Sequence, residues 1–143
     1  MTGVVVLLAA VLLAVVAAAM LSWKDGRFAK HDSPHQGIET LTPADLGIEL
    51  GERATMVQFS SAFCSPCRAT RVLLTDIAAK VDGVVTVDID AEEHLPLVRR
   101  FHVMRTPTVL VLDADGRVTT RASGMPRREQ VLVALGEAVG DRR

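Results

Sequence analysis

The chain opens with an unbroken apolar run. Residues 3–21 carry no charge, and no polar side chain interrupts the run from Val4 to Leu21. A helix of this length is about 28 Å long, which matches the hydrocarbon core of a bilayer, and in lipid it satisfies its own backbone hydrogen bonds. Trp23 follows at the depth of the membrane interface, where indole rings are favoured. The pattern predicts a transmembrane anchor over residues 1–23, in contact with the membrane through residues 3–21.

A cleaved signal peptide is the main alternative to this anchor. Ala17, Ala18 and Ala19 resemble a small-residue cleavage site. Signal peptides, however, carry positive charge before a shorter apolar run, and no lysine or arginine precedes this one. A buried core helix would usually keep a polar face, which this run lacks. A retained anchor, or an uncleaved signal-like segment, is therefore favoured.

Basic residues follow the apolar run and none precedes it. They are Lys24, Arg27 and Lys30. The positive-inside rule then indicates a single-pass membrane protein whose C-terminal part lies in the cytoplasm.

A polar segment separates the apolar run from the rest of the chain. Residues 31–37 are interrupted by Pro34 and Gly37, which is typical of a connecting segment. The pattern predicts a linker over residues 24–36 and a folded domain over residues 37–143.

Within that domain, short apolar runs alternate with helical patterns. The apolar runs predict strands over residues 38–41, 55–60, 84–89, 108–112 and 117–121. The helical patterns begin at Pro43 behind a Thr42 cap, cover residues 67–80 and 91–101, and resume at Pro126, with Pro96 marking a kink or a late start. The order β-α-β-α-β-α-β-β-α predicts an α/β fold with a mixed central sheet flanked by helices.

The helical patterns also predict which side chains are buried. Over residues 67–80 the apolar face is expected to contain Val72, Leu73, Ile77 and Ala78. The last helix is expected to bury Val131, Leu132 and Leu135.

Composition and charge narrow the class of protein. The chain has 143 residues, which suits one domain plus an appendage, and its net charge of −1 gives no electrostatic basis for binding nucleic acid. It has only two cysteines, so it lacks the spread of cysteines that a structural disulfide framework needs.

The two cysteines, Cys64 and Cys67, stand where a strand pattern gives way to a helical one. A cysteine at a helix N-terminus lies near free backbone N–H groups and the positive end of the helix dipole, and both favour the thiolate. The thiolate is the form that attacks a disulfide. Cys67, one turn inside the helix, is shielded and well placed to resolve a mixed disulfide, and Pro66 helps fix the turn.

Half of a zinc site is the alternative for this pair. Zinc takes about four ligands, and a second cysteine pair is absent. Of the four histidines, His31 and His35 lie in the predicted linker, whereas His94 and His102 flank the third helix of the domain. We therefore expect no metal, and no other cofactor is implied.

Three stretches of the chain resemble the thioredoxin family. Residues 59–67, FSSAFCSPC, resemble its active-site segment, and residues 87–90, VDID, resemble its third strand and the exit from it. Residues 101–108, FHVMRTPT, resemble the segment that holds the family's cis-proline, and Gly124 matches a glycine near the active site. The resemblance covers roughly residues 36–140 and implies a thioredoxin-like fold behind the membrane helix.

The resemblance implies a role for each of these residues. Cys64 would be the nucleophile and Cys67 the resolving thiol, together forming a redox-active disulfide. Pro107 would be cis, with the backbone of Thr106 pairing with a bound peptide. The other substrate-binding positions would be Phe63, Ser65, Pro66 and Gly124. The implied partners are protein thiols or disulfides and an electron donor or acceptor, with the protein acting as a monomer.

The sequence also departs from the family's pattern. Phe63 replaces a tryptophan, and the residues between the cysteines are Ser-Pro rather than Gly-Pro. Gln58 stands where the family has a buried acid, and Thr86 replaces the lysine that often pairs with that acid. Because Gln58 cannot titrate, it cannot take a proton from Cys67, and that step should be about ten-fold slower where it limits the rate. A dedicated partner fits this neutral site better than general reducing activity does.

These observations favour a thiol–disulfide oxidoreductase that acts on proteins through a mixed disulfide, as a reductase rather than an oxidase. The alternative is a redox-sensing or partner-docking module with little turnover. Tethered members of the family often face outward, an expectation that opposes the charge pattern around the anchor.

Overall fold

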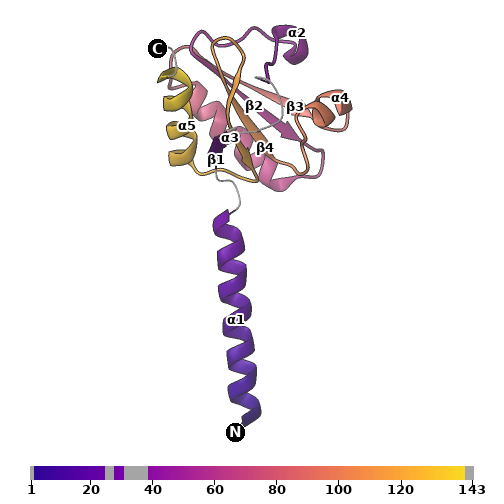
Figure 1. The fold of residues 1–143 in the computed structure, drawn as a ribbon, viewed down its shortest axis with the longest axis vertical. Helices are drawn as coiled ribbons and strands as arrows, with labels where there is room; N and C mark the ends of the chain where they lie inside the picture. Colours follow the sequence, from indigo (N-terminus) through magenta and orange to yellow (C-terminus); the bar gives the residue numbers. More distant parts are fainter. Residues whose placement is uncertain (1, 25–27, 31–38, 141–143) are drawn as a thin grey trace.

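The computed structural model describes residues 2–24, 28–30 and 39–140 and is drawn as a ribbon in Figure 1. Helix α1 (Thr2–Lys24) extends away from a sheet that carries helices on both faces. The part of α1 from Thr2 to Leu21 is long and apolar enough to cross a membrane and buries none of its surface in the protein. A signal sequence near the N-terminus would have the same properties.

The sheet has five strands in the order β1-β5-β4-β2-β3. They are β1 (Phe28–Lys30), β2 (Ala54–Ser60), β3 (Val84–Asp90), β4 (Thr108–Asp113) and β5 (Val118–Ser123). β2 and β3 are parallel, whereas the other neighbouring pairs are antiparallel. This is the mixed sheet that the order of elements predicts.

The sheet divides the core into two layers, and helices cover both of its faces. α2 (Pro43–Leu46) and α4 (Leu95–Arg100) pack on one face of the sheet through Leu46 and Leu97. α3 (Ser65–Ala78) and α5 (Arg128–Gly140) pack on the other face. All seven residues of β2 are buried, as expected for a central strand covered on both faces.

The structure differs from the prediction at the N-terminal edge of the domain. The strand expected over residues 38–41 is reduced to one bridge between Thr40 and Arg117. β1 instead forms within the expected linker and pairs with β5, because the Phe28 ring packs against the core between the sheet and α5. Lys24, the first residue of that linker, instead ends α1. The other linker residues, and both predicted ends of the domain, lie outside the described residues.

Two predicted helix faces were partly wrong. Val72 and Leu132 are exposed, whereas Leu74, Ala134 and Ala138 are buried. In α5 the alanines are buried because small side chains let the helix lie close to the sheet. The helix expected over residues 91–101 begins late, at Leu95, with Pro96 in its first turn.

Thr42 caps α2 as predicted. Its side chain accepts a hydrogen bond from the Asp45 backbone N–H, and the Asp45 carboxylate accepts one from the Thr42 N–H at 2.9 Å. That backbone hydrogen bond, helped by Arg100 at 3.5 Å, holds the pKa of Asp45 below its ordinary value.

Candidate active site

Cys64 and Cys67 lie where the central strand passes into α3. β2 ends at Ser60, and Cys64 is the N-cap residue of α3, with extended backbone angles. The two cysteines are joined by a disulfide, with their Cα atoms 5.2 Å apart. Cys67 is buried, whereas Cys64 keeps part of its surface exposed. One sulfur of the pair is therefore accessible and the other shielded.

The first turn of α3 stabilises charge on the accessible sulfur. The backbone N–H of Cys67 donates a hydrogen bond to Cys64 Sγ at 3.2 Å. An N–H donor and the positive end of the helix dipole both favour a thiolate over a thiol at this place. The arrangement therefore suits a nucleophilic sulfur at Cys64.

The chain before β4 meets the chain after β5 beside this helix. The peptide bond between Thr106 and Pro107 is cis, as the family resemblance implies. The Thr106 and Ser61 hydroxyl oxygens lie 3.1 Å apart, and the Gly124 N–H donates to the Pro107 carbonyl at 2.7 Å. Gly124 has a φ of +96°, a left-handed conformation that favours glycine.

Arg121 holds the segment that leads to Pro107. Its guanidinium donates to the His102 carbonyl at 2.9 Å and also to the Phe101 carbonyl. Burial lowers the pKa of Arg121 from its ordinary value, and the charge of Glu39 partly offsets this. The hydrogen bonds satisfy carbonyl groups at the end of α4, so this segment has a fixed path to the site.

A groove of about 350 Å³ brings four of the predicted site residues together, namely Pro66, Thr106, Pro107 and Gly124. Phe63 and Ser65 lie beside Cys64, outside the lining of this groove, and Phe63 is 98% exposed. The sequence analysis missed three further lining residues: Arg105, Met125 and Arg127. Their proximity in sequence to Thr106 and Gly124 was the signal that could have identified them.

Gln58 lies beneath the disulfide. It is 1% exposed, and its side-chain amide donates to the Cys67 carbonyl at 2.8 Å. Its amide oxygen is buried and has no hydrogen-bond partner among the described residues. Gln58 therefore ties β2 to the first turn of α3 and leaves one acceptor unused beneath the site.

An acidic residue that the sequence analysis did not single out stands next to Gln58. Asp88 is opposite Gln58 in the parallel pairing of β2 and β3, whereas Thr86 is opposite Met56. The Asp88 carboxylate accepts from the Ser60 hydroxyl at 3.0 Å and forms an ion pair with Arg71 of α3. Its charge is therefore compensated within the sheet and helix that support the cysteines.

Two histidines of the zinc alternative, His94 and His102, are among the described residues, and they lie at the two ends of α4. His94 caps the start of α4, and His102 follows its end. Within residues 2–24, 28–30 and 39–140, no group of three or more His, Cys, Asp or Glu side chains is arranged to hold a metal ion.

Known proteins match this arrangement in sequence and in fold. The family model for thioredoxin matches residues 39–136. Thioredoxin from Alicyclobacillus acidocaldarius subsp. acidocaldarius is 29% identical over 102 residues, which are 70% of this chain and 96% of that protein. Human thioredoxin domain-containing protein 2 is 28% identical over 86 residues, which are 60% of this chain and 16% of that protein.

Solved structures show the same fold at lower identity. A mutant thioredoxin from Halobacterium salinarum NRC-1 has a TM-score of 0.55 and 16% identity, covering 62% of this chain and 76% of that one. Fasciola hepatica thioredoxin has a TM-score of 0.52 and 20% identity, covering 60% and 81%. With the family model matched over most of the domain, the chain belongs to the thioredoxin family of thiol–disulfide oxidoreductases.

Proposed function

We propose that this protein is a membrane-anchored reductase of protein disulfides, with Cys64 as nucleophile and Cys67 as resolving thiol. The observation that carries the proposal is the Cys67 N–H bound to the accessible Cys64 sulfur at the start of α3. This donor stabilises the thiolate that attack on a substrate requires. The reductase direction and the retention of α1 as an anchor are parts of the proposal.

Reduction of a substrate proceeds in two exchanges. The Cys64 thiolate attacks one sulfur of the substrate disulfide, forms a mixed disulfide and expels the other substrate sulfur, which takes up a proton. Cys67 then gives up its proton and attacks Cys64 Sγ, which releases the second substrate thiol. Two electrons pass to the substrate, and the protein is left with the Cys64–Cys67 disulfide. A dithiol reductant must return it to the reduced form.

The groove beside the cysteines suits an extended peptide. Thr106 lines it with Pro66 and Pro107, and its backbone is the proposed partner of the substrate's main chain. Gly124 leaves room because it has no side chain. Phe63 and Ser65 would flank the bound segment next to Cys64.

Gln58 supports a second candidate function, that of a redox-sensing or partner-docking module. A buried amide cannot take the proton of Cys67, so the mixed disulfide would persist longer than with a buried acid. A long-lived mixed disulfide would suit a module that docks or senses a partner and turns over slowly.

The reduction potential and two serine variants test the proposal together. A reductase should have a potential near about −270 mV, whereas an oxidase would lie near about −120 mV. Cys67→Ser should trap mixed disulfides with its substrates, and Cys64→Ser should abolish the reduction of insulin. Persistent insulin reduction by Cys64→Ser would refute the mechanism. Failure of the natural chain to cycle with any dithiol would favour the docking module.

A further inference from the structure

The first strand determines where the anchor helix joins the domain. β1 runs antiparallel to β5, with Phe28 opposite Ala122 and Lys30 opposite Thr120. Phe28, the end of β1 that follows α1, therefore lies near Ser123, where β5 ends. The chain enters the sheet at that edge.

The same edge carries the cysteines. Phe59, near the end of β2, is opposite Thr108, and Thr108 is opposite Ser123. The exit of β2 toward Cys64, the start of β4 after Pro107 and the end of β5 therefore lie at one edge of the sheet, which we call the active-site edge. The starts of β2 and β3 and the turn between β4 and β5 form the opposite edge.

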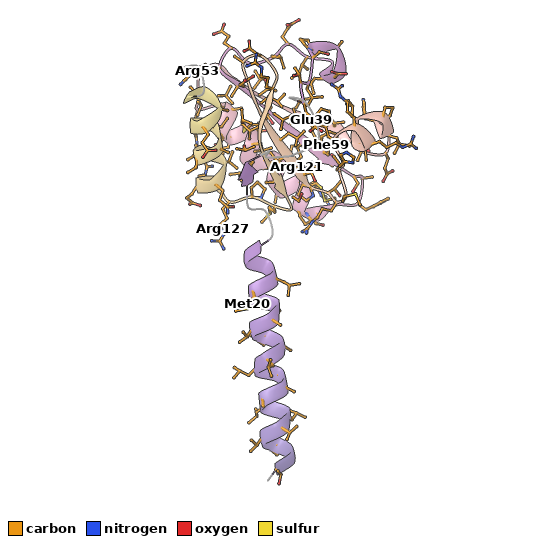
Figure 2. The ribbon with its side chains drawn as sticks, viewed as in Figure 1. Met20, Glu39, Arg53, Phe59, Arg121 and Arg127 are labelled. Carbon is orange, nitrogen blue, oxygen red and sulfur yellow. A yellow bond between two sulfur atoms is a disulfide. The ribbon has the colours of Figure 1, made fainter. Side chains whose placement is uncertain are left out.

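Figure 1 shows β1 at the end of the domain nearest α1. In Figure 2, Arg127, which lines the groove beside Pro107, also lies at this end, whereas Arg53, just before β2, lies at the far end. This view and the strand register agree on which edge lies toward the helix.

Chain length keeps this edge near the helix. Three residues separate Lys24 from Phe28, and the connecting backbone reaches at most about 14 Å. Three strand spacings between β1 and β2 add a sideways offset of about 14 Å. Turning the opposite edge toward the membrane would require the connection to run back along β5 from Ala122 to Val118, about 14 Å, which would use its whole extended length.

The active-site edge also has the side chains of a membrane-proximal surface. Phe63 and Met104 are 98% and 89% exposed, and Met125 is exposed beside them. Two basic residues, Arg105 and Arg127, also line the groove. Apolar side chains next to basic ones suit contact with a segment that leaves the bilayer among lipid phosphates.

We propose that the active-site edge faces the membrane that α1 spans, and that the substrate is a disulfide of an integral membrane protein held close to the bilayer surface. The inference rests on the proposed function of Cys64 and Cys67 and on retention of α1. It narrows the substrate class from protein disulfides in general to those that a short tether can reach.

Two matched arginines test the orientation without using activity. The full chain with Cys64→Ser and Cys67→Ser carries either Arg127→Cys or Arg53→Cys, and the new thiol is labelled with a fluorophore. The protein is placed in phosphatidylcholine–phosphatidylglycerol vesicles whose headgroups bear a short-range nitroxide quencher. We expect stronger quenching at position 127 than at position 53. Equal or reversed quenching would overturn the inference.

A longer tether supplies the control. Insertion of twenty glycine and serine residues after Lys24 should reduce the difference between the two labels, because the domain can then turn freely. If the difference persists unchanged, the short connection does not orient the domain and the inference fails.

The substrate class is tested with two transmembrane peptides. One carries a cystine loop directly at the membrane surface, and the other carries it beyond a twenty-residue helical spacer of about 30 Å. The natural chain should reduce the near loop at least about ten-fold faster, because the tether raises its effective concentration there. The long-tether variant should reduce both loops at similar rates.

Soluble insulin separates the two proposals. If the natural chain reduces insulin but reduces the two loops equally fast, the inference about substrate fails while the proposed function stands. If neither insulin nor either loop is reduced, the proposed function fails, and the quenching experiment still decides the orientation.

Discussion

The two edges of the central sheet differ in how completely their groups are packed and hydrogen-bonded. At the opposite edge, the Leu41 N–H donates to the Gly116 carbonyl at 2.8 Å, and the Asp113 carboxylate accepts from the N–H groups of Asp115 and Arg117. A Cβ atom at Gly116 would lie 2.2 Å from the Leu41 carbonyl oxygen. The backbone groups at the opposite edge are therefore hydrogen-bonded and tightly packed within the protein.

The active-site edge is packed and hydrogen-bonded less completely. Phe63 and Met104 are almost fully exposed, and the buried Gln58 amide oxygen has no partner among the described residues. Exposed side chains contribute little to stability and can contact another molecule, whereas a buried acceptor without a partner lowers stability. The comparison therefore predicts that changes at the opposite edge affect folding, whereas changes at the active-site edge affect exchange.

Among substitutions at the two edges, the largest effect on stability is expected at Gly116. Its φ of +80° and the close Leu41 carbonyl mean that Gly116→Ala strains the backbone and forces the turn apart. We expect the free energy of unfolding to fall by about 2–4 kcal/mol. Denaturant unfolding of the full chain in detergent micelles measures it.

Gly136 provides the matched control. It lies in α5 with open space around its Cα, so Gly136→Ala should raise stability by about 0.5–1 kcal/mol. Equal losses of stability for Gly116→Ala and Gly136→Ala would contradict a special role for the packing at the opposite edge.

At the active-site edge, Gln58→Asp should change the rate of exchange. A carboxylate beneath Cys67 can take its proton, so release of substrate from the mixed disulfide should speed up about ten-fold at pH values where the acid is ionised. Single-turnover measurements with a labelled peptide disulfide report this step. Gln58→Leu lacks a base and should show no gain. If it accelerates release equally, proton transfer is not the cause.

A smaller effect is expected at the cap of α2. Because the Thr42 N–H lowers the pKa of Asp45 in the folded state, the stabilisation is complete above the pKa of the unfolded chain and is lost as pH falls through the lower folded pKa. Asp45→Ala should cost about 0.5–1 kcal/mol at neutral pH, since solvent screens the pair with Arg100. The difference from the natural chain should vanish in strong acid. A constant difference between pH 7 and about pH 2 would rule out the charged form as its source.

The smallest effect on stability is expected at Met104. Because this side chain is 89% exposed, Met104→Ala should change the free energy of unfolding by less than about 0.5 kcal/mol. Slower reduction of a peptide substrate at unchanged stability would assign Met104 to substrate contact. The buried Met56 is the matched control, and Met56→Ala should cost about 2–5 kcal/mol.

Local signals in the sequence predicted most of the domain. The Thr42 cap and the strand before Cys64 each depend on neighbouring residues, and each is present in the structure. The helix faces were less predictable. Val72 and Leu74 are both apolar, and only the direction from which the sheet approaches α3 decides which one is buried.

Some features of the site could likewise be predicted from the sequence, and others could not. Cys64, Pro66 and Cys67 could be recognised along the chain because their chemistry depends on residue type and spacing, whereas Pro107 was recognised through the family resemblance. The contacts of Gln58 with Cys67 and of Asp88 with Arg71 could not, because they join segments whose distance depends on strand register and helix position.

The sequence alone predicts a dithiol pair at the start of a helix, in an α/β domain that follows an apolar helix. It does so because hydrophobic periodicity, caps and turns are properties of short stretches. The position of Phe28, which lies in the expected linker but joins the sheet at the edge that carries Cys64, depends on tertiary contacts. Pairing with β5 and packing of one aromatic ring against α5 fix that position, and both join residues about ninety or more positions apart, a distance at which local sequence patterns carry no information.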